Sequence, residues 1–272
     1  MKGHAMKTKH GLFGAALILA AAGAGALSCR EVRAIDKAEI ETAVAAVAAH
    51  DHGGSRKPLD EVERLARETR GIPELRACLE DALSKLLSSG ATQASKKFAC
   101  EQLWIIGTDR SLPALGKLLL ADDTVEMACF AISRHPSPAA GRTLREALGK
   151  IKGRGLAPVA SLLGERRDAE AVDALVEHAS GQDETAAFAA IAALGKIAAG
   201  KAVETLTGLH KSADARRRDA AAHALLECAQ ELARKGSVDQ ATSIHGELIA
   251  DREHPQIRRA ALVDRIELGG VA

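Results

Sequence analysis

The stretch from Thr185 to Leu209 reads TAAFAAIAALGKIAAGKAVETLTGL, and it decides the fold because its pattern recurs along the chain. Its apolar residues fall at steps of three in two runs, which a break containing Gly200 separates. The runs consist of Phe188, Ile191, Leu194 and Ile197, and then of Val203, Leu206 and Leu209. This spacing predicts two short amphipathic helices that fold back on each other. Neither helix can bury its apolar face alone, so the stretch predicts one repeat of a helical solenoid.

Two rows of aliphatic residues repeat with a common period of about 30 residues. The row in the first helix of each pair consists of Leu103, Ile132, Leu163, Leu194 and Leu225, at intervals of 29, 31, 31 and 31 residues. The row in the second helix consists of Leu86, Leu115, Leu144, Leu175 and Leu206, at intervals of 29, 29, 31 and 31 residues. Two independent rows with one period are hard to obtain by chance, and they predict a stack of helical pairs.

The composition agrees with a helical core. Hydrophobic residues make up 47% of the 272 residues, but aromatic residues make up only 2% and Tyr is absent, so Ala and Leu must form the core. Ala has the highest helix propensity, and the chain lacks the alternating β-branched runs that indicate strands. The predicted class is all-α, a right-handed α-solenoid of about five to six stacked antiparallel helix pairs.

Three stretches share a further pattern, in which an Ala-rich helix with Leu-Gly is followed by a turn with Asp and by a Val-x-x-Leu helix. They are residues 99–115, residues 163–175 and residues 194–206. The pattern resembles HEAT repeats of the short bacterial kind, the PBS-lyase-like HEAT repeats. The resemblance covers residues 59–232 and implies the solenoid fold. It implies no particular ligand, because family members share a packing pattern and not a partner.

The chain is predicted to have three parts: a signal peptide over residues 1–28, a capping helix and loop over residues 29–58, and the repeat domain over residues 59–272. The capping helix is expected from Glu31 to His50, and a loop with two glycines and Pro58 follows it. The first helical pair is expected at residues 59–70 and 73–89.

The repeat pattern loosens in two places. After Ile132, residues 133–136 (SRHP) replace the Leu-Gly continuation, so this first helix is predicted to be the weakest. Near the C-terminus, residues 216–235 predict a longer helix, and residues 229–248 resemble a degenerate tetratricopeptide repeat, a related helical hairpin. A final helix is predicted from His254, and its outer face is expected to be half covered at best, which makes that end a cap or a docking surface.

The first 28 residues have the features of a targeting segment. Three lysines lie within the first nine residues, residues 12–20 are apolar, and residues 24–26 (AGA) form a small-residue cleavage site. The segment predicts an exported protein, periplasmic or secreted, whose mature chain begins near Leu27. An uncleaved membrane anchor is disfavoured, because the run over residues 11–27 is short and weakly apolar for a span of about 20 residues.

Cys29 leaves a second alternative open. The sequence from Ala26 to Cys29 resembles the lipobox of bacterial lipoproteins, in which the cysteine is lipidated and becomes the mature N-terminus. The lipobox has Leu three places before the cysteine and a small residue two places before it, whereas Ala26 and Leu27 are transposed here. Lipidation of Cys29 would make the protein a membrane-anchored lipoprotein scaffold.

The charge balance argues against a general nucleic-acid binder. The chain has 37 basic and 36 acidic residues, and loss of residues 1–26 removes three lysines and no acid, which leaves 34 against 36. Proteins that bind phosphate backbones need a basic excess or stripe. We therefore expect a protein partner and no nucleic acid, with membrane contact only through the signal peptide or a lipid anchor.

The five cysteines form no Cys-x-x-Cys motif and no zinc spacing. Cys100 and Cys129 lie one period apart, so they occupy equivalent places on neighbouring first helices. A disulfide between them stays open, because stacked helices lie about 10 Å apart and the Cα atoms must come within about 7 Å. Small buried hydrophobic residues are the favoured interpretation.

No metal site, cofactor site or catalytic motif is predicted. His50 and His52 form the only close histidine pair, and a metal site needs three or four convergent ligands, so a solvated loop is expected there. The chain has no Gly-x-Ser-x-Gly, no His-Glu-x-x-His and no phosphate-binding glycine loop. The resemblance leaves an enzyme of the lyase or DNA glycosylase type as the alternative. Such enzymes usually exploit aromatic stacking, and the aromatics expected in core positions here are Phe98, Trp104, Phe130 and Phe188.

Basic side chains of the second helices are the candidates for partner binding. On the concave face, where second helices of HEAT pairs usually lie, they are Lys117, Arg142, Arg145 and Lys201. Acids between them, such as Glu146 and Asp173, favour a mixed, solvated face over a basic stripe. We expect a non-catalytic scaffold of the cell envelope that binds a protein on this face. A deep pocket with convergent polar groups would instead indicate the enzyme.

Overall fold

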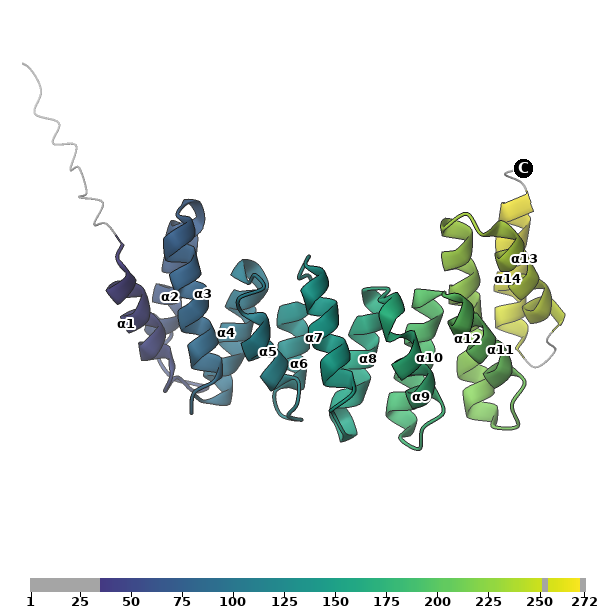
Figure 1. Cartoon of the computed structure of the whole chain (residues 1–272), viewed down its shortest axis with the longest axis horizontal. Helices are drawn as coiled ribbons and strands as arrows, with labels where there is room; N and C mark the ends of the chain where they lie inside the picture. The colour runs from purple at the N-terminus through teal and green to yellow at the C-terminus, as the bar shows by residue number, and fades with distance from the viewer. Residues whose placement is uncertain (1–34, 251–253, 270–272) are drawn as a thin grey trace, which may run out of the picture. The chain divides into compact units, whose positions relative to one another are not determined.

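The computed structural model describes residues 35–250 and 254–269, which fold as helices joined by short turns (Figure 1). These residues contain no strand, and the predicted all-α solenoid is confirmed. The predicted signal peptide, Cys29 and residues 31–34 of the expected capping helix lie outside the described residues.

Six helical pairs follow one another in the described residues. Their first helices are α2 (Lys57–Glu68), α4 (Gln93–Ile106), α6 (Val125–Ile132), α8 (Leu156–Glu165), α10 (Glu184–Ile197) and α12 (Ala215–Arg234). Their second helices are α3 (Pro73–Leu87), α5 (Leu112–Leu118), α7 (Pro138–Leu148), α9 (Val172–Ala179), α11 (Gly200–His210) and α13 (Val238–Ala250). Helix α1 (Lys37–Val47) precedes the pairs and α14 (Pro255–Gly269) follows them. Three single 3₁₀ turns lie at Thr69–Gly71, Gly153–Gly155 and Ala169–Ala171.

Each pair packs on the next one along the chain (Figure 1). The first helices contact one another in a row from α2 to α12, and the second helices form a parallel row in which α5 lies between α3 and α7. Helix α1 packs on α2 and α3, and α14 packs on α12 and α13. This nearest-neighbour packing is what defines a solenoid.

The capping helix is shorter than predicted. It begins at Lys37 because Asp36 is its N-cap, whose carboxylate accepts a hydrogen bond of 2.8 Å from the backbone N–H of Glu39. It ends at Val47, three residues before the predicted end at His50. The first pair agrees closely with prediction, since α2 starts two residues early, with Pro58 in its first turn.

Both predicted rows of aliphatic residues lie in the core. All ten residues are at most 5% exposed, and seven of them, among them Leu194 and Leu206, are fully inaccessible. The period read from the sequence is therefore the period of the packing, and the register of the helices is confirmed.

The Leu-Gly pair of the repeat has a steric role. A Cβ atom placed on Gly195 of α10 would lie 2.6 Å from the carbonyl oxygen of Ala224 in α12. One period earlier, a Cβ atom on Gly164 of α8 would lie 2.7 Å from the Cα atom of Ala193 in α10. Only glycine lets these helices come so close, because any side chain would overlap the backbone of the next helix.

The same position holds different residues in the earlier repeats, Trp104 in α4 and Ser133 after α6. The indole of Trp104 stacks on Phe130 of α6, with ring centroids 5.5 Å apart. The glycine contact of the later repeats is therefore replaced here by an aromatic contact between α4 and α6. The prediction that the aromatics lie in the core is right for Phe98 but wrong for Phe130, which is 46% exposed, while Trp104 and Phe188 are half-buried.

The pair around Ile132 has the shorter first helix that its sequence predicts. Helix α6 has eight residues, whereas α4 and α10 have 14 each. It ends at Ile132, four residues before Pro136, and the residue before a proline is disfavoured in helical conformation. The stability of this pair relative to the others stays a prediction.

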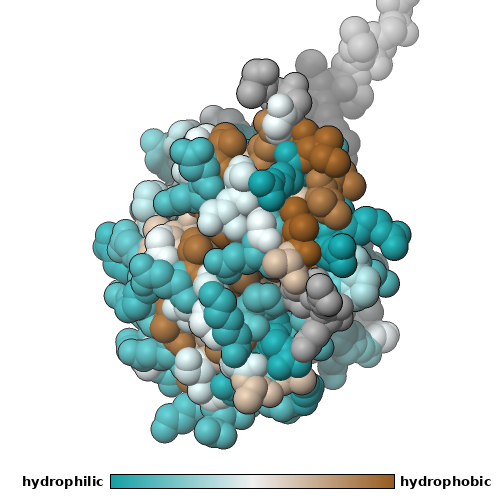
Figure 2. Space-filling model, turned by 90° about the vertical axis from the view of Figure 1, so that its right-hand side faces the viewer, coloured by the Kyte–Doolittle hydropathy of each residue, from teal (hydrophilic) through white to brown (hydrophobic). Residues whose placement is uncertain are grey.

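The final helix leaves part of its surface uncovered, as expected. In α14, Ile257 and Ala261 are buried against the preceding pair, while Leu262, Val263 and Ile266 are 39%, 49% and 72% exposed. Figure 2, which looks onto this end of the chain, shows hydrophobic residues gathered on one side of it.

We predict that Gly195→Ala lowers the free energy of unfolding by about 1–3 kcal/mol, because the added methyl group meets the backbone of Ala224. The matched control is Gly208→Ala in α11, where an added Cβ atom has no neighbour within 4 Å. Helix propensity alone should make that variant more stable by about 0.5–1 kcal/mol. Urea melts followed by circular dichroism measure both changes, and a shift of the same sign in both variants would contradict the steric role.

We also predict that Leu194→Ala costs about 2–5 kcal/mol through lost apolar burial and the cavity left behind. Arg142→Ala, at an exposed position of α7, should lower the free energy of unfolding by less than about 0.5 kcal/mol. Urea melts compare the two, and equal losses would show that the inner and outer faces have been wrongly assigned.

Candidate functional site

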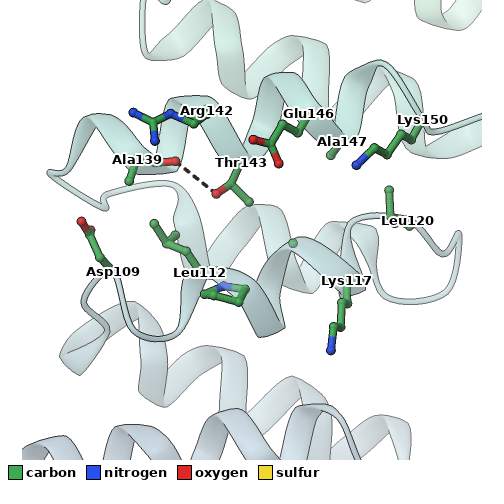
Figure 3. Close-up of a pocket in the computed structure, with 12 residues that line it drawn as sticks. Asp109, Leu112, Lys117, Leu120, Ala139, Arg142, Thr143, Glu146, Ala147 and Lys150 are labelled. Carbon is green, nitrogen blue, oxygen red and sulfur yellow. Dashed lines mark hydrogen bonds between the residues drawn. The ribbon is translucent and has the colours of Figure 1, made fainter.

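A groove of about 430 Å³ lies between α5 and α7, in the row of second helices (Figure 3). Its apolar lining comes from Leu112, Pro113, Leu120, Ala139 and Ala147. Its charged lining comes from Asp109, Lys117, Arg142, Glu146 and Lys150. The hydroxyl of Thr143 donates to the carbonyl of Ala139 at 3.1 Å. This groove is the candidate site because it combines an apolar floor with an exposed charged rim.

Local sequence places both helices of the groove. Helix α7 begins at Pro138, after Ser137, whose hydroxyl accepts a hydrogen bond of 3.1 Å from the N–H of Ala139. Ser137 also donates to the Asp109 carboxylate at 3.0 Å, which ties the start of α7 to the turn before α5. Arg142 and Glu146 follow on α7 at a step of four, and Lys150 follows four residues later, just beyond the end of the helix. All three line the groove (Figure 3).

The three basic residues of the groove have no internal partner. The side chains of Lys117, Arg142 and Lys150 are exposed and form no hydrogen bond or ion pair with any residue that the structure describes. The same holds for the exposed carboxylate of Glu146. The groove therefore presents three cations and two carboxylates, one of which, Asp109, is already hydrogen bonded to Ser137.

The other two predicted binding residues lie elsewhere, in ion pairs between repeats. Arg145 bonds to Asp168 and, at 2.8 Å, to Glu170, both in the turn before α9. Lys201 bonds to Asp173, and this hydrogen bond raises the pKa of the Lys201 ammonium. The structure thus brings together Lys117 and Arg142 and separates them from Arg145 and Lys201.

Sequence reasoning missed two residues of the groove, Leu120 and Lys150. Leu120 is 48% exposed just after α5, although its neighbour Leu119 is buried. Lys150 lies beyond the end of α7. The spacing of Arg142, Glu146 and Lys150 at steps of four was the signal that could have found Lys150.

A second groove, of about 390 Å³, lies in the row of first helices between α4 and α6. It lies beside the stacked rings of Trp104 and Phe130, and Phe130 is one of its lining residues. The others are Lys97, Cys100, Glu101, Asp123, Glu126 and Met127. Two grooves therefore open on the same two helical pairs, one in each row.

The buried acids of the described residues act as structural ties. Glu80 of α3 is 2% exposed and accepts hydrogen bonds from the backbone N–H groups of Thr108 at 2.6 Å and Ser111 at 3.1 Å. Glu231 of α12 is 5% exposed and bonds to Arg234 and Arg167. The hydrogen bond from Arg234 lowers the pKa of Glu231 despite the opposing effect of burial. Both carboxylates are satisfied by their own neighbours.

The described part of the chain holds neither a cluster of metal ligands nor a helix suited to span a membrane. No group of three or more His, Cys, Asp or Glu side chains there is placed to hold a metal ion. None of the helices found there combines the length and apolar character of a membrane span.

The four cysteines of the described residues are free thiols. Cys100 and Cys129 are buried and do not form the disulfide that the sequence left open, so the interpretation as small buried hydrophobic residues is confirmed. Burial raises the pKa of Cys100, Cys129 and Cys228 to about 12.

The family model described as HEAT repeats matches residues 156–226, which confirms the resemblance over that part of the chain. Human deoxyhypusine hydroxylase in complex with glycerol is one similar solved structure, at 15% identity and a TM-score of 0.39, with 72% of this chain and 97% of that chain covered. A designed armadillo repeat protein in complex with the peptide (KR)4 is another, at 18% identity and a TM-score of 0.31, with coverage of 84% and 99%. No curated protein matches the chain.

We predict that iodoacetamide at pH 8 modifies half-buried Cys78 before Cys100, Cys129 or Cys228. Alkylation needs the thiolate, and the raised pKa values keep the three buried thiols protonated at that pH. Peptide mass spectrometry of timed samples gives the order, with urea-unfolded protein as the control in which all four react. Equal rates in the native protein would show that the buried thiols are accessible.

Proposed function

We propose that the protein is a non-catalytic binding and assembly scaffold that holds a protein partner on the row of second helices. The proposal starts from the solenoid fold, in which residues 156–226 match HEAT repeats. The observation that carries the proposal is the groove between α5 and α7, whose three cations have no partner in the described chain. This row is the face that the sequence assigns to partner binding.

The contrast with neighbouring repeats supports this position. Arg145 and Lys201 are engaged with acids of the next repeat, so a partner would have to break those pairs before binding them. Lys117, Arg142 and Lys150 need no such exchange. Charge complementarity at such exposed groups raises the association rate and selects the partner more than it adds affinity.

The chemistry of the groove indicates the kind of segment it would hold. Acidic side chains would neutralise Lys117, Arg142 and Lys150, and an aliphatic side chain would cover Leu112 and Leu120. Glu146 lies between Arg142 and Lys150, and its carboxylate would repel a run of adjacent acids. We therefore infer a segment with spaced acids around an aliphatic residue.

A scaffold is favoured over an enzyme by the exposure of the charged groups. Asp109, Lys117, Arg142, Glu146 and Lys150 are all exposed. Acid–base catalysis generally relies on ionisable groups that burial or close charges have perturbed. The groove offers attachment points for a partner, and the proposal assigns it no reaction.

We further propose that the scaffold acts in the cell envelope, as a periplasmic or secreted protein that begins near Leu27. Mass spectrometry of the protein isolated from its own cells should find this N-terminus. A lipid-modified Cys29 would replace the soluble form by a membrane-anchored lipoprotein. An intact Met1 would contradict export.

Site-directed photo-crosslinking tests the binding face. A benzophenone side chain at Leu120, which is 48% exposed in the groove, should give a covalent adduct with one protein in the producing cells. The same probe at Ile72, which is 41% exposed and outside the groove, is the position control and should give none.

The double substitution Lys117→Glu with Arg142→Glu should remove the Leu120 adduct, because it reverses two charges of the groove. Lys201→Glu is the matched control and should leave the adduct in place, since Lys201 lies outside the groove. No adduct at Leu120, or an adduct that survives the double reversal, would contradict the proposed face.

A further inference from the structure

An exposed aromatic patch lies on the opposite row, that of the first helices. We call the patch the α4–α6 face, and its members are Lys97, Glu101, Trp104, Ile105, Glu126, Met127, Phe130 and Arg134. Phe130 is 46% exposed and Ile105 is 61% exposed. In a chain with one Trp and four Phe, two aromatic rings stack at this one surface.

The patch exists because Trp104 stands where later repeats have glycine. Its ring is half-buried and stacks on Phe130 of α6, with ring centroids 5.5 Å apart. The groove of about 390 Å³ beside it is lined by Met127 and by the buried Cys100. Trp, Phe and Met are the residues enriched in the cores of protein interfaces.

Opposite charges flank Phe130 at equal spacings in the sequence. Glu126 lies one helical turn before Phe130 on α6, and Arg134 lies four residues after it, in the turn that follows the end of α6 at Ile132. Both are exposed, and neither forms an ion pair with a described residue. The Arg134 guanidinium lies over the Trp104 ring, 5.0 Å from its centroid. When a second copy of the segment 126–134 is placed antiparallel to the first, it presents a base where the first presents an acid.

We propose that the α4–α6 face binds a second copy of this chain about a two-fold axis. The axis passes beside Phe130, so that α6 of one copy lies antiparallel to α6 of the other. Each Glu126 then lies opposite Arg134 of the second copy, and the two Phe130 rings meet at the centre. Such a contact is self-complementary and closes as a dimer.

Apolar and charged residues have different roles in this contact. Removal of Phe130, Trp104 and Ile105 from water supplies the affinity. The groove beside Met127 leaves space for an aliphatic side chain such as Ile105 of the second copy. The two Glu126–Arg134 pairs lie at the rim, where they contribute little affinity but select the antiparallel orientation.

Sedimentation equilibrium of the full chain over a range of concentrations tests the proposal. The wild type should fit a monomer–dimer equilibrium. Glu126→Arg and Arg134→Glu each place like charges opposite each other, so each should weaken the dimer at least tenfold. The double variant exchanges the two charges and should dimerise as the wild type does.

A mixing experiment gives the sharpest result. The two single variants, each monomeric alone, should form a 1:1 heterodimer when mixed, because every acid then meets a base. Ile72→Glu, which lies outside both grooves and is 41% exposed, is the control that leaves dimerisation unchanged. A wild type that stays monomeric at every concentration, single variants that still dimerise, or a mixture that stays monomeric would each overturn the proposal. Circular dichroism confirms that every variant is folded.

Discussion

The stack depends on the approach of each first helix to the backbone of the next. In α8, α10 and α12 this contact is made where Gly164 meets Ala193 and Gly195 meets Ala224. No pair can bury its own apolar face, so each pair takes its stability from its neighbours. The small residues at Gly164, Ala193, Gly195 and Ala224 follow from this constraint, because a larger side chain there would overlap the backbone of the neighbouring helix.

Polar contacts between repeats follow the same period as the apolar ones. Gln93 bonds to Asp123, Asp81 to Arg110, Glu165 to Lys196 and Glu184 to Arg216, at separations of 29 to 32 residues. Many charged residues are thus engaged between repeats. The unpaired charges described above belong to α5, α6, α7 and the residues just after α6 and α7. They lie beside α4, where Trp104 stands at the glycine position, and include those of the short helix α6.

The sequence predicted the fold well because a solenoid is periodic. Burial of Leu103 or Leu206 depends only on local spacing, which a sequence displays directly. The candidate site was harder to predict, because whether a charged side chain forms an ion pair depends on the residues of the neighbouring repeat. Arg145 and Arg142 lie on the same helix, yet only Arg145 reaches the turn at Asp168. The exposure of Phe130 was missed for a similar reason, because its surroundings include Trp104 of another helix, on which it stacks.

The placement of the two grooves on opposite rows of the same two pairs has a mechanical consequence. A small change in the angle between these pairs moves α4 and α6 apart as it brings α5 and α7 together, like the two ends of a lever. A molecule that pushed α5 and α7 apart would therefore narrow the space between α4 and α6, and one bound between α4 and α6 would narrow the other groove.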